Sequence, residues 1–201
     1  PSSNLFLVGM MGAGKTTVMQ AVRDCLAQTG KTVICTREPG GTDVGEEIRR
    51  VLLTPGRTLD AGTELLLMFA SRAQLVNALI KPALARGDYI VTDRFTDASF
   101  AYQGGGRGIE ASDIRALETR FVGIQPDLTL LLDLSVDQGM ARAQSRGQSL
   151  DRIESERHDF FLNVRAAYLR RAAEDPQRIK VIDASQTAES VVRQVLDALT
   201  I

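Results

Sequence analysis

The sequence predicts an α/β fold in which a five-stranded parallel sheet is flanked by helices. Short β-branched or aliphatic runs alternate with longer segments of helical period, which is typical of βαβ units around a parallel sheet. Residues 128–134, LTLLLDL, are so apolar that both faces of that strand are expected to be covered. A chain of 201 residues that is 44% hydrophobic is long enough to bury one core, so we expect a single domain over residues 1–201.

The expected elements follow in chain order. Strands are expected at the β-branched or aliphatic runs 4–8, 32–36, 89–93, 128–134 and 179–182. Helices are expected where apolar residues recur at helical period, at 17–28, 44–53, 63–86, 111–121, 136–146, 154–173 and 188–199. Pro82 interrupts the longest of these helices near its end. The segment GGGRG at 104–108 is the richest linker, and glycine-rich loops are more often hinges than anion sites.

Charge and composition exclude several functional classes. The 24 Lys and Arg against 25 Asp and Glu give a formal net charge of -1, so no global field draws the chain to nucleic acid or to an anionic membrane. The longest apolar runs fall far short of the roughly 18 residues of a membrane span, and no secretory signal is visible, so we expect a cytoplasmic protein. Cys25 and Cys35 are too few and too far apart for a disulfide framework or a metal site, and we expect buried thiols.

The strongest motif follows the first strand. Gly9, Gly14, Lys15 and Thr16 fit G-x-x-x-x-G-K-[ST] between a strand and a helix, which is the context of a phosphate-binding loop, or P-loop. Backbone N–H groups hold the phosphates, Lys15 reaches the outer ones, and the Thr16 hydroxyl meets Mg²⁺. The alternative is a glycine turn that only caps the helix. The residues expected to bind ATP here are Gly9, Met10, Met11, Gly12, Ala13, Gly14, Lys15, Thr16 and Thr17.

Two further segments at strand ends narrow the class. Asp93 ends the third strand and can hold the water shell of Mg²⁺, while Arg94 can clamp a phosphate with two hydrogen bonds, although a surface ion pair is the alternative. Arg37 follows the second strand and is expected to hold the acceptor phosphate, unless its segment is only a helix-entry turn. We expect Lys15 and Arg94 to be catalytic. No guanine-reading N-K-x-D element occurs, which argues against a GTPase.

The sequence resembles bacterial thymidylate kinase over most of its length. The resemblance implies transfer of the γ-phosphoryl group of ATP to dTMP in dTTP synthesis, with Mg²⁺, by a homodimer. It also implies the P-loop nucleoside-monophosphate kinase fold, with a small flap (LID) at about residues 142–153. The motifs that show the resemblance are TREPGG (36–41), ELLLMFASRAQ (64–74), DRFTDASFAYQGGGRG (93–108), PDLTLLLDL (126–134) and LDRIE (150–154).

The resemblance assigns residues to the acceptor base. Phe69 and Arg72 lie three apart on one helix and so face the same way. The implied roles are a stack of Phe69 on the pyrimidine and donation by Arg72 to the O4 carbonyl; without the resemblance, a core Phe and a solvated Arg would be favoured. Tyr102 is assigned the exclusion of a ribose 2′-hydroxyl, and Ser99 and Gln103 are assigned contacts around the base.

The flap segment ARAQSRGQSLDRIE contains Arg142, Arg146 and Arg152. These side chains could simply form a solvated helix face. In thymidylate kinases without an arginine inside the P-loop, where this chain has Ala13, the flap supplies basic residues to the transferring phosphoryl group. The resemblance therefore implies that Arg146 is catalytic and that Arg142 binds ATP, with positive charge placed against the equatorial oxygens.

The P-loop itself departs from the family. Thymidylate kinases usually have an acid just before the first loop glycine and another two residues after it, where this chain has Val8 and Met11. The segment NLFLVGMMGAGKTT is more similar to the start of a shikimate kinase. A divergent kinase, an engineered or chimeric loop, a nucleotide-binding protein with weakened catalysis and a shikimate-type metabolite kinase therefore all stay open.

Overall fold

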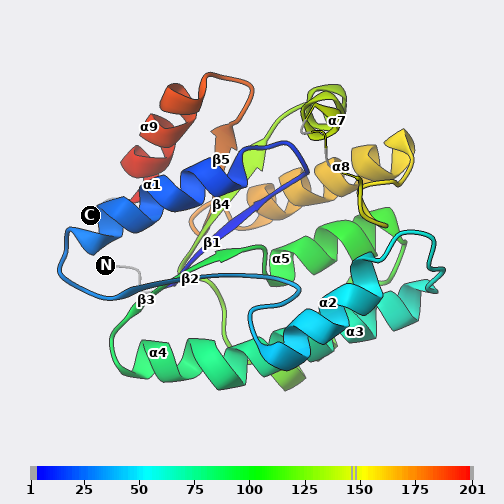
Figure 1. The fold of residues 1–201 in the computed structure, drawn as a ribbon, viewed down its shortest axis with the longest axis horizontal. Helices are drawn as coiled ribbons and strands as arrows, with labels where there is room; N and C mark the ends of the chain where they lie inside the picture. The colour runs from blue at the N-terminus through cyan, green and yellow to red at the C-terminus, as the bar shows by residue number, and fades with distance from the viewer. Residues whose placement is uncertain (1–3, 146, 148, 200–201) are drawn as a thin grey trace.

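The computed structural model describes residues 4–145, 147 and 149–199 (Figure 1). Five strands form one sheet in the order β2-β3-β1-β4-β5, and every neighbouring pair is parallel. This confirms the expected parallel α/β architecture. The strands are β1 Asn4–Gly9, β2 Val33–Arg37, β3 Tyr89–Asp93, β4 Leu128–Asp133 and β5 Ile179–Asp183.

Helices connect the strands and cover both faces of the sheet (Figure 1). Three π-helical turns, η1 Val76–Ile80, η2 Phe100–Gly106 and η3 Glu118–Val122, extend α3, α5 and α6. No helix within the described residues has the length and apolar character needed to cross a membrane. The α-helices are α1 Lys15–Ala27, α2 Asp43–Leu53, α3 Ala61–Leu75, α4 Lys81–Ala85, α5 Thr96–Ser99, α6 Ala111–Leu117, α7 Val136–Gln144, α8 His158–Glu174 and α9 Ala188–Leu199.

The central strand β1 is buried on both sides. Leu5 and Leu7 belong to the core cluster that α1 and α9 complete, whereas Phe6 and Val8 face two clusters on the opposite side. Successive side chains of a strand point to opposite faces, so a strand covered on both faces must be apolar throughout. The burial of β1 therefore fixes the position of the P-loop that follows it.

The long helix expected at 63–86 is present as α3, the π-helical turn η1 and α4, which follow one another without a break. The π-helical turn η1 joins α3 to α4, and Pro82 lies just after it, in the first turn of α4. Proline has no N–H to donate and its ring clashes with the carbonyl four residues earlier. A turn with i→i+5 spacing removes that clash, so the helix continues past Pro82 and does not break there.

The segment GGGRG is not the expected linker. Gly104 to Gly106 belong to the π-helical turn η2, which packs against α8. A Cβ at Gly105 would come within 2.6 Å of the Ala167 Cβ, and one at Gly106 within 2.4 Å of the Phe160 ring. These glycines therefore allow two helical segments to approach closely, and the hinge interpretation is wrong.

Two smaller expectations also fail. Helix α8 begins at His158 and not at 154, because the Asp151 carboxylate accepts the N–H groups of Ile153 and Glu154 and holds those residues in a turn. The cysteines are not buried: Cys35 is exposed and Cys25 is half-buried. Cys35 lies on β2, which pairs only with β3 and so forms an edge of the sheet.

Candidate active site

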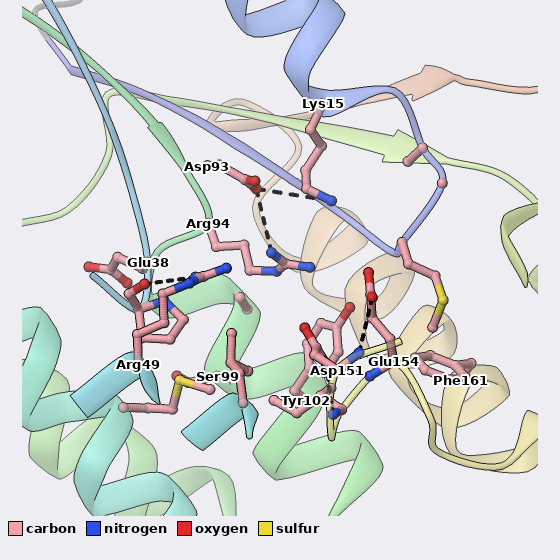
Figure 2. Close-up of a pocket in the computed structure, with 18 of the residues that line it drawn as sticks. Lys15, Glu38, Arg49, Asp93, Arg94, Ser99, Tyr102, Asp151, Glu154 and Phe161 are labelled. Atoms are coloured by element: carbon pink, nitrogen blue, oxygen red, sulfur yellow. Dashed lines mark hydrogen bonds and ion pairs between the residues drawn. The ribbon is translucent and has the colours of Figure 1, made fainter. Parts of the chain in front are cut away.

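A cavity of about 420 Å³ opens at the carboxyl ends of β1, β2 and β3. Its wall includes the P-loop, the residues after β2 and β3, one face of α3, the turn η2 and part of the flap. Figure 2 shows Arg94 near the centre, with Lys15 and Asp93 above it, Arg49 on one side and Tyr102 and the flap residue Asp151 on the other. The cavity lies where an open parallel sheet binds its ligands.

The P-loop presents backbone donors and one cation. Gly14 precedes α1 with φ 83°, a left-handed conformation that favours glycine, and no side chain caps the helix. The first N–H groups of α1 are therefore available to an anion. Lys15 Nζ is buried and donates to the carbonyl oxygens of Met10 (3.0 Å) and Gly9 (3.3 Å). Gly9 and Met10 thus contact Lys15. The P-loop residues that line the cavity are Met11, Gly12, Ala13, Gly14, Lys15 and Thr16. Thr17 is exposed and does not line the cavity.

Asp93 and Arg94 form the centre of the site. Asp93 Oδ1 lies 4.0 Å from Lys15 Nζ and 3.8 Å from Arg94 Nη1, and it accepts no hydrogen bond within the described residues. A buried carboxylate oxygen without a donor, beside the Thr16 hydroxyl in the same cavity, fits Mg²⁺ held by one carboxylate and by phosphates. Arg94 has φ 71°, which is uncommon outside glycine and is found most often at functional sites.

Arg49 completes a positive wall that the sequence analysis missed. Arg49 lines the cavity and donates from Nη1 to the Pro39 carbonyl at 2.8 Å. Burial, together with the charges of Arg37 and Arg94, lowers the pKa of Arg49, so three cations converge on one region and favour an anion there. Arg49 and Leu53, four residues apart on one face of α2, both line the cavity, but no motif in the sequence marks them.

Arg37 does not line the cavity. Its side chain is exposed and pairs with Glu46 at 3.2 Å, while the other Glu46 oxygen accepts the N–H of Gly41 at 2.9 Å. The ion pair of Arg37 with Glu46 fixes the turn after β2. This arrangement agrees with the alternative that the segment is a turn leading into helix α2. Arg37 contributes positive charge near Arg49, which does line the cavity, and its contact with the acceptor phosphate stays a prediction.

Among the described residues that line the cavity, α3 contributes Met68 and Arg72 but not the ring of Phe69. This ring is buried in the core cluster beneath α3 and lies 4.6 Å from the Arg72 guanidinium carbon, whereas Met68 lines the cavity. Adjacent residues of a helix point about 100° apart, and Phe69 lies against Arg72, which does line the cavity. The stacking of Phe69 on the base therefore stays a prediction, and Met68 is a further residue of α3 that faces the cavity.

Arg72 is buried and donates to three protein acceptors. It donates from Nε to Glu38 at 2.7 Å, from Nη1 to Ser99 Oγ at 3.0 Å and from Nη2 to the Phe95 carbonyl at 3.2 Å. Only 2% of its surface is exposed, yet it still lines the cavity. Ser99 therefore positions Arg72, in addition to any contact of its own with a base.

Tyr102 and Gln103 both line the cavity from η2. The Tyr102 ring centre is 5.7 Å from the Arg94 guanidinium carbon, and Tyr168 packs edge-on against the same ring. Gln103 donates to Glu64 at 2.8 Å, so its amide nitrogen already has a protein partner. The rigid ring suits a steric role, and Glu64 holds Gln103 in place at the cavity wall.

The flap arginines have different surroundings. Arg142 lines the cavity and donates to the Ala184 carbonyl at 2.9 Å, which places it beside the loop after β5. Arg146 lies outside the described residues, so its catalytic role stays a prediction. Arg152 does not line the cavity: it is buried and bonded to Leu52 and Glu64.

Met11 lies where the family has an acid, and its side chain is 5% exposed. It belongs to a core cluster with Val8, Tyr102, Val136 and Phe161. The departure from the family thus replaces charged groups by apolar packing between the P-loop, η2 and α8. Because the phosphate donors of the loop are backbone groups and Lys15, this packing leaves the phosphate cradle in place.

The buried pair Glu38 and Arg72 predicts a pH-dependent stability. Burial raises the pKa of Glu38 from 4.5 to about 7, against the charge and hydrogen bond of Arg72. Between these pH values the folded protein keeps a proton that the unfolded chain has released, so the free energy of unfolding falls as pH rises. Glu38→Gln removes this titration. The melting temperature of the unsubstituted protein, minus that of the variant, should fall by about 5–10 °C between about pH 5 and 8. A constant difference would mean that Arg72 keeps Glu38 ionised throughout.

The fold and the cavity together define a P-loop kinase that acts on a small phosphorylated acceptor. The phosphate loop after β1, the acid and arginine after the neighbouring strand β3, and Arg49 opposite them support this class. A family model described as thymidylate kinase matches residues 8–195, and the chain belongs to the thymidylate kinase family.

Individual relatives agree with the family model. The chain is 50% identical over 190 residues to a thymidylate kinase of Nitrosospira multiformis, covering 94% of this chain and 92% of that protein. It is 51% identical over 195 residues to a thymidylate kinase of Pseudomonas putida, covering 96% and 93%. A crystal structure of thymidylate kinase from Ehrlichia chaffeensis superposes with a TM-score of 0.81 at 29% identity, covering 100% of both chains.

Proposed function

We propose that the chain transfers the γ-phosphoryl group of ATP to dTMP and releases dTDP and ADP. An oxygen of the dTMP phosphate forms a bond to the γ-phosphorus, and the bond to the β,γ-bridging oxygen breaks with its electron pair going to ADP. One observation supports this most strongly. In a chain of the thymidylate kinase family, a single cavity holds the acid Asp93 with its Oδ1 4.0 Å from the P-loop cation Lys15 and 3.8 Å from the guanidinium of Arg94.

The donor side consists of the P-loop and Arg142. The N–H groups at the start of α1 hold the β- and γ-phosphates, Lys15 follows the transferring group, and Arg142 packs toward the nucleoside end. Thr16 and Asp93 would hold Mg²⁺, which would supply positive charge to the phosphates. These two residues and the P-loop line the same cavity.

The acceptor side consists of Arg49, Arg94 and Arg72. Arg49 and Arg94 hold the acceptor phosphate in line with the γ-phosphoryl group, and Arg72 donates to the O4 carbonyl of thymine. Tyr102 crowds the position of a ribose 2′-hydroxyl, and Met68 takes the packing position against the base. No general base is required, because positioning and charge stabilisation dominate phosphoryl transfer.

The assembly we propose is a homodimer in the cytoplasm, the compartment of both nucleotide substrates. Support for a dimer comes from apolar side chains that a monomer would leave in water. Leu66 on α3 is 60% exposed and Val44 on the neighbouring helix α2 is 52% exposed. Exposed aliphatic side chains on adjacent helices favour burial against a second copy.

The test is ADP release with a panel of acceptors at saturating ATP. We expect kcat/KM for dTMP to exceed that for CMP by at least about a hundredfold, because an arginine that donates to a carbonyl opposes an amino group at position 4. GMP and shikimate should give no turnover above the background without acceptor. Equal use of CMP would contradict the base assignment, turnover of shikimate would favour a metabolite kinase, and ATP binding without turnover would favour a non-catalytic nucleotide binder.

A further inference from the structure

We propose that Glu64 is a positioning residue that docks the flap onto the acceptor side of the cavity and so sets the affinity for dTMP. In this proposal the flap means the described residues 149–157, which follow α7 and do not include Arg142. The proposal rests on the function proposed above, and its test includes a measurement that does not depend on that function.

Glu64 is a buried acid at which three donors meet. It lies on α3 with 1% of its surface exposed and accepts from Gln103 at 2.8 Å, from Arg107 at 3.0 Å and from Arg152 at 2.7 Å. Burial raises the pKa of Glu64, but the hydrogen bonds from these three side chains outweigh it and hold the pKa below its ordinary value. Glu64 is therefore a buried anion with its partners on separate segments.

Two of these contacts tie the flap to the rest of the molecule. Arg152 belongs to the flap, and besides Glu64 its Nε donates to the Leu52 carbonyl at 2.6 Å, at the end of α2. Arg107 pairs with Glu64 at 3.0 Å and with the flap residue Glu156 at 2.7 Å. The flap is thus held at two residues, Arg152 and Glu156. Arg152 binds Glu64 directly, and Glu156 binds Arg107, which in turn binds Glu64.

The docked flap faces the ligand. Asp151, Ile153 and Glu154, which flank Arg152, line the cavity, and Figure 2 shows Asp151 and Glu154 beside Tyr102. Because Asp151, Ile153 and Glu154 are next to Arg152 in the chain, the hydrogen bonds of Arg152 fix where their side chains lie. Loss of these hydrogen bonds would therefore change the cavity wall and not only the surface of the protein.

Glu64 shares one face of α3 with the acceptor site. Glu64, Met68 and Arg72 are spaced four residues apart, and side chains at this spacing follow one stripe of a helix. Met68 and Arg72 line the cavity, and Gln103, which Glu64 also holds, lines it from η2. One stripe therefore binds the flap at one end and the acceptor base at the other, whereas the P-loop is not among the contacts of Glu64.

The test begins with Glu64→Gln, which keeps the shape but removes the charge. We expect KM for dTMP to rise about tenfold, with KM for ATP changed by less than about twofold, because the buried Arg152 and the half-buried Arg107 lose their shared anion. In hydrogen–deuterium exchange, the amides of the flap should exchange faster than in the unsubstituted protein. Unchanged KM for dTMP, or an equal rise in KM for ATP, would overturn the proposal.

Arg152→Gln tests the same tie from the flap side and serves if Glu64→Gln folds poorly. It should reproduce the rise in KM for dTMP and the faster flap exchange. The double variant should be no worse than the poorer single variant, since both remove one interaction. If the losses were instead additive and Arg152→Gln lowered only kcat, Arg152 would act at the transferring phosphoryl group. That result would contradict the docking role.

Asp97→Asn is the matched control. Asp97 is also a buried acid between two arginines, Arg171 at 2.6 Å and Arg178 at 2.7 Å, but it contacts no residue of the flap. This variant should lose thermal stability without faster flap exchange. If the unsubstituted protein does not phosphorylate dTMP, the proposed function fails, and flap exchange in Glu64→Gln still decides whether Glu64 docks the flap.

Discussion

Replacement of Lys15 by alanine is expected to lower kcat for dTMP phosphorylation by at least about a thousandfold. Lys15 Nζ lies 4.0 Å from Asp93 Oδ1 and is the cation of the P-loop. Charge that develops during transfer is stabilised by a cation already in place in a site that excludes much of the water, so its loss acts on the transition state. Steady-state ADP release at saturating ATP and dTMP measures the effect.

Lys15 is 9% exposed and donates to loop carbonyls, so its removal also perturbs the loop. Thermal unfolding should therefore accompany the kinetics, and a folded but inactive variant is the expected outcome. Lys31→Ala, at an exposed lysine just after α1, is the control and should keep full activity. Retention of normal turnover by Lys15→Ala would exclude Lys15 from the catalytic role.

Arg94→Gly is expected to lower kcat/KM for dTMP by about a thousandfold, because Arg94 is placed between donor and acceptor phosphates. Glycine is a better test than alanine. Arg94 has φ 71°, and glycine adopts this conformation without strain, so thermal stability should be kept or should rise by about 1 kcal/mol while activity is lost. Kinetics and thermal unfolding of the same sample measure both effects.

Arg94→Lys is the companion variant. It keeps a positive charge but loses the planar fork of donors, so its activity should lie between those of Arg94→Gly and the unsubstituted protein. Equal activity of the lysine variant and the parent would show that charge alone is needed. Full activity of Arg94→Gly would remove Arg94 from the site.

The sheet could be predicted because its central strands β1, β3 and β4 are buried on both faces. The apolar runs at β1 and β4 and the helical periods between them leave few other arrangements, and the P-loop motif is almost entirely local. The GGGRG segment was misinterpreted because glycine signals both flexible loops and close packing. The contact of Gly106 with Phe160 on α8, far away in the chain, decides between them.

The acceptor side was harder to predict because it depends on side-chain direction. Phe69 and Met68 are neighbours, and only the orientation of α3 shows that Met68 faces the cavity. Arg49 carries no local motif and enters the site because α2 lies beside it. Arg152 was expected near phosphate as part of a basic run, but the buried acid Glu64 binds it, and that acid is distant in sequence.

The most direct measurement follows the phosphoryl group itself. The protein is incubated with dTMP and with ATP that carries ¹⁸O in the γ-phosphoryl group, and the products are identified by mass spectrometry. The account predicts dTDP that contains the labelled phosphoryl group, with one ADP formed for each dTDP. ADP and labelled inorganic phosphate without labelled dTDP would contradict it.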